Sequence, residues 1–253
     1  MTETKRGWVW HEVMSTDVSK ASEYYRSLFG WGAEEMKMGE LGDYLMFKLG
    51  EMPVAGMAAA EPNLPSYWLG YVMVDDVTAT EAKVKELGGT ILAPVFDIPN
   101  IGKACIAQDP EGAVFAPFQG NQAEPAPQGP PPDGSVCWNE LMAKDDAKMA
   151  EFYTALLGWT ASPMGPGSTL LKEGERMVGT IRKKEGAALQ APSHWMVYFS
   201  VASVDEALTK HGDLGGATIM GKSEVPNMGE FAVVSDPAGG VYAFWHQTAP
   251  PPQ

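Results

Sequence analysis

Two stretches of the chain carry nearly the same sequence, and this duplication constrains the fold more than any other feature. The first reads WHEVMSTDVSKASEYYRSLFGW from Trp10, and the second reads WNELMAKDDAKMAEFYTALLGW from Trp138. The match continues to the DP-x-G motifs that start at Asp109 and Asp236. Solenoid units repeat every ~20–50 residues, so a repeat of this length is a whole domain. The sequence therefore predicts two homologous domains.

The repeat places the two domains at residues 5–120 and 134–248, joined by a linker over 121–133. The linker region, QGNQAEPAPQGPPPDG from Gln119, is rich in proline and glycine and almost free of large apolar residues. This composition is typical of an extended, semi-rigid connector. Each half is long enough to bury a core without disulfides or metal.

Within each half, the pattern of a strand, a helix and further strands occurs twice. WVWHEVM alternates as a strand, Asp17 can cap a helix, and Gly30 can end it. The apolar positions between them have helical spacing: Val18, Ala21, Tyr25 and Leu28. Short helices between antiparallel strands predict an α+β fold of four βαβββ modules, arranged as two tandem domains.

Charge and hydropathy exclude several classes of partner. The net charge of −14 argues against nucleic acid, because phosphate binding requires a basic surface. No apolar N-terminal segment and no 18-residue apolar run is present, so neither export nor membrane insertion is expected. We expect a cytoplasmic protein.

The motifs resemble those of the vicinal oxygen chelate superfamily, which contains glyoxalase I, the extradiol dioxygenases and the bleomycin- and fosfomycin-resistance proteins. The resemblance rests on Asp17 to Trp31, Val74 to Gly89 and Asp109 to Gly112, and on the same motifs in the second half. The W-x-E start of both halves is similar to the two-domain, glyoxalase-like hydroxylase/27-kDa-antigen branch. The resemblance implies modules whose strands curl around a cavity. In dimeric relatives this cavity forms between modules of different subunits, and a fused pair could satisfy this internally. The resemblance therefore implies a monomer or homodimer whose partner is a small-molecule ligand.

The resemblance also implies where a divalent metal would bind, on the first and last strands of each module. The last-strand positions correspond here to Ala116 and Ala243. The first-strand positions correspond to Trp10, Leu69, Trp138 and Met196, and the remaining strands pass near Gly56 and Gly179. An oxygen- and nitrogen-ligated metal needs several donor side chains that converge. We therefore predict no metal and no cofactor.

Glu12 and Glu140 are the candidate catalytic residues. Each is a lone carboxylate on an apolar, aromatic strand at the same place in both halves, where a raised pKa would suit a general acid or base. The alternative is that both serve the scaffold, for example by accepting backbone hydrogen bonds. His11 does not belong to an HExxH motif, and strand alternation turns it away from Glu12 towards the helix, where we expect a structural role.

Five further side chains are candidates for ligand binding: Trp10, Trp138, Tyr71, Tyr198 and His246. Aromatic rings that line a cavity would suit stacking on a planar ligand, and the tyrosine hydroxyls would supply polar contacts. Core packing explains the aromatic residues equally, and His246 could simply be exposed. Dinucleotide, P-loop and serine-hydrolase motifs are absent from the sequence.

These observations favour metal-independent binding of a small, partly apolar molecule in a cavity between modules. One alternative is a glyoxalase-like lyase or isomerase that uses Glu12 or Glu140 as a proton shuttle. Another is a metal-dependent, dioxygenase-type enzyme with relocated ligands. A third is a non-catalytic structural or interaction protein whose cavities are filled by its own side chains.

Overall fold

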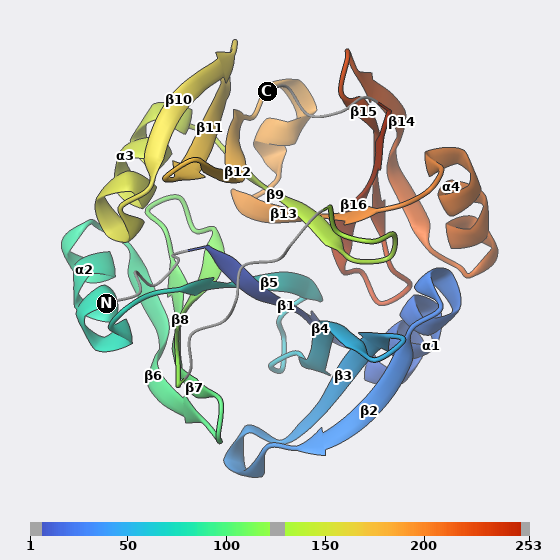
Figure 1. Cartoon of the computed structure of the whole chain (residues 1–253), viewed down its shortest axis with the longest axis horizontal. Helices are drawn as coiled ribbons and strands as arrows, with labels where there is room; N and C mark the ends of the chain where they lie inside the picture. Colours follow the sequence, from blue (N-terminus) through green and yellow to red (C-terminus); the bar gives the residue numbers. More distant parts are fainter. Residues whose placement is uncertain (1–6, 122–129, 249–253) are drawn as a thin grey trace. The chain divides into compact units, whose positions relative to one another are not determined.

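The computed structural model describes residues 7–121 and 130–248, so residues 122–129 of the predicted linker lie outside the described part (Figure 1). The described chain forms sixteen β-strands and four α-helices. The order strand, helix, three strands occurs four times, which is the predicted βαβββ module. None of the described helices is long and apolar enough to cross a bilayer.

The first repeat contains two modules. The first module comprises β1 (Trp8–Ser15), α1 (Val18–Phe29), β2 (Gly32–Lys37), β3 (Asp43–Leu49) and β4 (Met52–Ala59). The second module comprises β5 (Tyr67–Met73), α2 (Val77–Glu86), β6 (Thr90–Ile98), β7 (Gly102–Gln108) and β8 (Val114–Gly120). A short 3-10 helix, Gly39–Leu41, precedes β3.

The second repeat contains the third and fourth modules. The third module comprises β9 (Val136–Ala143), α3 (Asp146–Leu157), β10 (Thr160–Gly165), β11 (Ser168–Glu173) and β12 (Arg176–Lys183). The fourth module comprises β13 (His194–Ser200), α4 (Val204–Asp213), β14 (Ala217–Val225), β15 (Gly229–Ser235) and β16 (Val241–Gln247). A 3-10 helix, Gly186–Gln190, precedes β13.

Helix α1 begins and ends where its sequence predicts. The Asp17 side chain accepts a hydrogen bond from the Lys20 backbone N–H at 3.0 Å, which satisfies one of the free donors of the first turn. Gly30 ends the helix in the left-handed conformation, with φ +72°, which residues with a Cβ adopt only with strain. Asp145 and Gly158 do the same for α3.

The strands form two eight-stranded mixed sheets with matching orders, β2-β3-β4-β1-β5-β8-β7-β6 and β10-β11-β12-β9-β13-β16-β15-β14. The first and last strands of each module pair in parallel, as in β1 with β4 and β5 with β8. The remaining strands of each module pair antiparallel. This arrangement confirms the predicted α+β class.

The chain divides into two compact units that each combine one module from either repeat. Unit 1 holds most of the second and third modules, over described residues 7–10, 69–121 and 139–196. Unit 2 holds most of the first and fourth modules, over described residues 11–68, 130–138 and 197–248, because the boundaries cross β1, β5, β9 and β13. The predicted ranges 5–120 and 134–248 mark the two sequence repeats, whereas the compact units take one module from each repeat.

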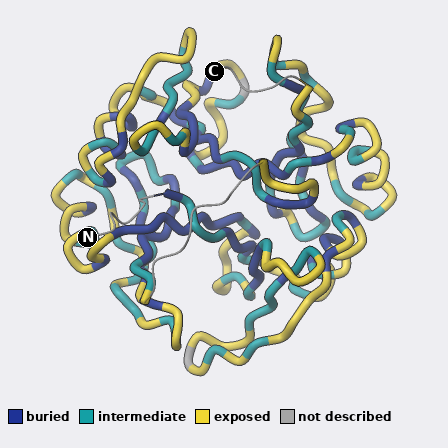
Figure 2. Tube along the Cα trace, in the orientation of Figure 1, coloured by how far each residue is buried: buried dark blue, intermediate teal, exposed yellow. Residues whose placement is uncertain are grey.

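Each unit has its own hydrophobic core, visible as buried chain in Figure 2. In unit 1, side chains of α3 and Val84 of α2 pack with Phe115 and Trp195. In unit 2, side chains of α1 pack with Phe199, Tyr242 and Phe244. Burial of apolar area at about 25 cal/mol per Å² makes these cores the main source of stability of each unit.

An Asp–Tyr–Trp triad recurs in each unit, and its Asp–Tyr hydrogen bond joins two modules. In unit 2, Tyr25 Oη donates to Asp236 Oδ2 at 2.7 Å, and Trp68 Nε1 donates to Tyr25 Oη at 3.1 Å. In unit 1, Tyr153 Oη donates to Asp109 Oδ2 at 3.0 Å, and Trp195 Nε1 donates to Tyr153 Oη at 2.8 Å. The aspartates open the DP-x-G turns, so this motif binds the helix of a module from the other repeat.

Candidate functional site

Strand β1 presents Glu12 on the face that points away from the helices. Val13 belongs to the unit 2 core with residues of α1, and side chains alternate along a strand, so His11 shares the Val13 side and Glu12 lies opposite. We call this opposite side the helix-free face. Only 7% of Glu12 is exposed. The predicted orientation of His11 towards the helix agrees with this alternation.

Tyr67 is a neighbour of Glu12 that sequence reasoning did not select as a site residue. Both lie in unit 2, and Trp68 belongs to the core, so alternation places Tyr67 on the helix-free face of β5. Burial raises the pKa of the Tyr67 phenol, and the negative charge of Glu12 raises it further. A protonated phenol therefore lies within electrostatic reach of a buried carboxylate.

Glu140 is anchored by two side chains of β12. Its Oε2 accepts a hydrogen bond from Thr180 Oγ1 at 3.0 Å and another from Arg182 Nε at 3.1 Å. The ladder places Thr180, rather than Gly179, opposite Glu140. Gly56 lies opposite Glu12, and Ala58 of β4 takes the place of Arg182, so the two equivalent carboxylates have different surroundings.

Tyr71 and Tyr198 lie at equivalent ladder positions on the helix-free face. Tyr71 pairs with Ala116 across β5 and β8, and its ring lies 6.3 Å from that of Phe118. Tyr198 pairs with Ala243 across β13 and β16, and its ring lies 6.2 Å from that of Phe231. Each unit thus places a tyrosine beside a small methyl group and a second aromatic ring.

The structure separates His246 from this face. Tyr242 and Phe244 of β16 belong to the unit 2 core, so alternation puts His246 on their side of the strand, opposite Ala243. His246 Nδ1 lies 3.0 Å from the Val201 backbone oxygen. Trp10 and Trp138 occupy equivalent, half-buried positions of β1 and β9, as the repeat predicts.

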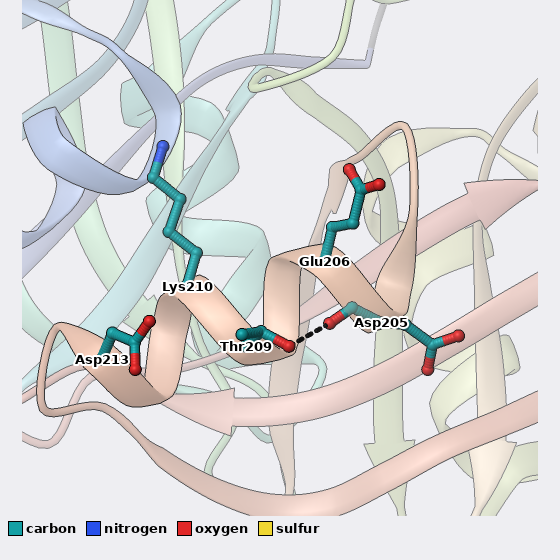
Figure 3. A pocket seen from close by; sticks show the side chains of 5 residues that line it. All are labelled: Asp205, Glu206, Thr209, Lys210 and Asp213. Atoms are coloured by element: carbon teal, nitrogen blue, oxygen red, sulfur yellow. Dashed lines mark hydrogen bonds between the residues drawn. The ribbon is translucent and has the colours of Figure 1, made fainter.

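Two surface hollows lie along α4, and neither is lined by the predicted site residues. One, of about 350 Å³, is lined by Asp205, Glu206, Thr209, Lys210 and Asp213 (Figure 3). The other, of about 220 Å³, lies between the C-terminal end of α1, residues 133–134, the 200–203 loop and α4. Lys210 Nζ donates to the Leu28 backbone oxygen at 3.0 Å in this second hollow.

Comparison with known proteins identifies relatives over nearly the whole chain. The family described as the glyoxalase-like domain matches residues 135–244. The Mycobacterium tuberculosis protein named "Putative glyoxylase CFP32" is 36% identical over 92% of both chains. The anthracycline biosynthesis protein DnrV of Streptomyces peucetius is 27% identical over 92% of this chain and 90% of its own.

Among solved structures, the Mn(II)-bound glyoxalase from Novosphingobium aromaticivorans is similar with a TM-score of 0.64 and 17% identity. The similarity covers 97% of this chain and 83% of that one. At this identity the likeness concerns the fold alone.

The residues of this chain do not fit the metal that such relatives bind. Within residues 7–121 and 130–248, no group of three or more His, Cys, Asp or Glu side chains is arranged to hold a metal ion. Ala116 and Ala243, at the last-strand positions, are fully buried and offer no donor atom.

Proposed function

Because this chain belongs to the glyoxalase-like family of the vicinal oxygen chelate superfamily, we propose that it binds a small, partly apolar organic molecule without using a metal ion. Each unit offers its own helix-free face to a ligand. Glu12 is the polar anchor in unit 2 and Glu140 is the polar anchor in unit 1, and Tyr71, Tyr198, Trp10 and Trp138 provide apolar and aromatic surface.

The observation that carries this proposal is the environment of Tyr71 and Tyr198. Each tyrosine pairs across the strands with an alanine, at the position where metal-binding relatives need a metal ligand. Each tyrosine ring also lies near the ring of a phenylalanine. Small-molecule sites are mostly apolar and aromatic with a few polar groups, which is the composition found here. Glu12 and Glu140 are buried, so their interactions with a ligand are little screened by water.

The ligand class that suits these faces is a planar, polycyclic aromatic compound with hydroxyl or carbonyl groups. Tryptophan and tyrosine rings stack on planar rings, and carboxylates accept hydrogen bonds from phenolic hydroxyls. DnrV is named for anthracycline biosynthesis, and anthracyclines belong to this chemical class. An anthracycline is therefore the first probe to use.

Titration of the purified protein with an anthracycline, followed by tryptophan fluorescence and calorimetry, tests the proposal. We expect saturable binding that is unchanged after treatment with a chelator. Glu12→Gln and Glu140→Gln should weaken binding by about tenfold each, since a buried hydrogen bond to a charged group is worth about 1.5–3 kcal/mol. Glu34→Gln, on the exposed edge strand β2, is the matched control and should bind normally.

Two results would contradict the proposal. One is the loss of binding when a stoichiometric divalent ion is removed, because this would show a metal site with relocated ligands. The other is unchanged affinity in both glutamine variants together with lowered stability, because this would assign the carboxylates to the scaffold.

A second candidate function, proton transfer in a lyase or isomerase, is favoured by the proximity of Glu12 to Tyr67. The Glu12 carboxylate would remove a proton from the carbon next to a carbonyl and return it to the adjacent carbon. The Tyr67 hydroxyl, kept protonated by its raised pKa, would donate a hydrogen bond to the developing enolate oxygen. The relative CFP32, named as a glyoxylase, fits this chemistry.

Solvent-deuterium exchange into the hemithioacetal of a 2-oxoaldehyde, followed by NMR, tests this second function. Glu12→Gln should abolish exchange, and Tyr67→Phe should slow it by about 10²-fold or more. Glu140→Gln is the matched control, because its carboxylate is held by Thr180 and Arg182. Absence of exchange in the wild-type protein would remove this candidate.

A further inference from the structure

Unit 2 contains a buried chain of hydrogen bonds next to its Asp–Tyr–Trp triad. Tyr24 Oη lies 2.5 Å from His211 Nδ1 and 2.6 Å from Tyr242 Oη. Tyr24 comes from α1, His211 from α4 and Tyr242 from β16. These hydrogen bonds therefore link both helices of unit 2 to strand β16. His211 is fully buried, with 0% exposure. We call these three residues the Tyr–His–Tyr chain.

Unit 1 has an apolar set at the same three positions. Phe152 corresponds to Tyr24, Val84 to His211 and Phe115 to Tyr242, and all three belong to the unit 1 core. The neighbouring glycines also correspond. A Cβ on Gly216 would come within 2.0 Å of His211 Cε1, and a Cβ on Gly89 would come within 2.7 Å of Val84 Cγ1. The same site therefore packs well in either form, and only unit 2 can bind a proton there.

The hydrogen bonds of the Tyr–His–Tyr chain are all made only when the His211 imidazole is neutral. When His211 is neutral and carries its hydrogen on Nε2, Tyr24 can donate to Nδ1 and Tyr242 can donate to Tyr24, so the two contacts hold two hydrogens. When His211 is protonated, Nδ1 also carries a hydrogen. Three donors then share two contacts, and one of them loses its acceptor. A buried donor without a partner costs about 1–3 kcal/mol.

Asp236 is the negatively charged group that acts on His211 and favours its protonated form. Tyr24 faces His211 from α1 and Tyr242 from β16, while the ring of Phe244 lies 5.9 Å away. Burial lowers the pKa of His211, and the Ala217 backbone and the negative charge of Asp236 only partly offset this. Asp236 already accepts hydrogen bonds from Tyr25 Oη and from the backbone of Ala238 and Gly240.

We propose that the Tyr–His–Tyr chain is a proton-sensitive switch that loosens the packing of α1 and α4 in unit 2 at mildly acidic pH, and that the helices of unit 1 have no such switch between them. Proton binding to His211 determines how the stability of unit 2 changes with pH. Above the ordinary histidine pKa of 6.5, His211 is neutral in both the folded and the unfolded unit. As the pH falls below 6.5, the unfolded unit takes up the proton first, and the stability of unit 2 decreases until folded His211 also titrates.

Hydrogen exchange by mass spectrometry on the full chain tests the switch. Exchange rates at pH 7.5 and 5.5, corrected for the intrinsic pH dependence, are compared for peptides of all four helices. We expect exchange in α1 and α4 to become up to about tenfold faster at pH 5.5, one pH unit below the ordinary pKa. In the His194→Tyr background, which removes the buried histidine of unit 1, the peptides of α2 and α3 should not change.

The chain supplies the variants that isolate His211. The switch should disappear in Tyr24→Phe/His211→Val/Tyr242→Phe, which copies the set of unit 1. The other histidines also have counterparts that do not ionise in this pH range. His11→Asn, His194→Tyr and His246→Gln are the matched controls. The His194 control matters because burial lowers the pKa of His194 in unit 1 as well. All three controls should keep the acid response of unit 2.

Three outcomes would overturn the proposal: equal acceleration in all four helices of the His194→Tyr protein, acceleration that persists in the triple variant, or loss of the response in one of the three histidine controls. If the triple variant fails to fold, the comparison of α1 and α4 with α2 and α3 in the His194→Tyr protein still decides. That comparison does not involve the ligand, so its result is independent of the proposed binding function.

Discussion

Units 1 and 2 share the Asp–Tyr–Trp triad and differ in the layer of side chains beside it. Unit 2 extends the triad with the Tyr–His–Tyr chain, whereas unit 1 has phenylalanines and a valine at these places. The reverse holds at the one variable position of the DP-x-G turn, where unit 1 has the polar residue. Unit 1 has Glu111, which accepts three hydrogen bonds, and unit 2 has Ala238.

This difference shows which parts of a repeated scaffold must stay and which can vary. The triad joins two modules through an acceptor that several donors share, so no member can be replaced alone. The adjacent layer only has to fill its volume and leave no buried polar group without a hydrogen bond. Either a set of apolar side chains or a set of side chains that hydrogen-bond to one another achieves this. The layer is therefore where one unit can gain pH sensitivity without changing the fold.

The largest expected effect comes from removing the triad aspartates. Asp236→Ala leaves Tyr25 Oη and the backbone N–H groups of Ala238 and Gly240 without their acceptor, and should lower the stability of unit 2 by about 3–5 kcal/mol. Asp109→Ala should cost unit 1 less at pH 7, because burial raises the pKa of Asp109 and already penalises its charged form. Urea denaturation with exchange of the helix peptides measures both. Equal losses would show that the two triads are equivalent.

A smaller effect is expected when the Tyr–His–Tyr chain is broken at one place. Tyr24→Phe removes the hydroxyl that joins His211 to Tyr242, and should destabilise unit 2 by about 2 kcal/mol. Adding His211→Val and Tyr242→Phe should recover most of this loss, since the full apolar set packs in unit 1. Losses that simply add up in the triple variant would show that the layer is not interchangeable.

Glu111→Ala should have a moderate effect that is confined to unit 1. Glu111 accepts hydrogen bonds from Ser193 Oγ and from the backbone N–H groups of Lys144 and Asp145. Burial acts to raise its pKa, but these hydrogen bonds outweigh burial and lower it. Removing them should cost about 1–2 kcal/mol at pH 7.

The pH dependence of this loss has a definite sign. A lowered folded pKa contributes stability above the unfolded value, which is 4.5 for Glu111, and this contribution disappears as the pH falls through the folded pKa. The difference between the wild type and Glu111→Ala should therefore shrink only below pH 4.5. Unfolding measured at pH 7, 5 and 3 checks this, and a difference that shrinks above pH 5 would contradict it.

The smallest effect is expected for Arg182→Ala. The Arg182 side chain is 48% exposed, so solvent screens its ion pair with Glu140, and the loss should stay below about 1 kcal/mol. Thr180→Val should cost more, because it removes a buried donor from the Glu140 carboxylate. Thermal unfolding of the two variants ranks them, and the opposite order would make Arg182 the main anchor.

The sequence predicted most local features of the fold and part of the candidate site. Caps such as Asp17 and Gly30 act within a few residues, so local rules locate the ends of α1. Alternation along β1 likewise separates His11 from Glu12. The contacts of Glu12 and Glu140 with neighbouring strands were missed, because Tyr67, Thr180 and Arg182 depend on strand register. The alignment of the strand next to Glu140 was off by one residue, so the sequence indicated Gly179 where the structure has Thr180.

By itself the sequence determined that the chain is duplicated, that each half contains two βαβββ modules, and which motifs recur. It did not determine which modules pack together. The two DP-x-G motifs and the two helix tyrosines are equivalent in sequence, so Asp236 matches Tyr25 and Tyr153 equally well. Only the tertiary structure joins Asp236 to Tyr25 and Asp109 to Tyr153, and so combines one module from each repeat in a compact unit. The physical reason is that local propensities act over a few residues, whereas this choice depends on contacts between residues more than 40 positions apart.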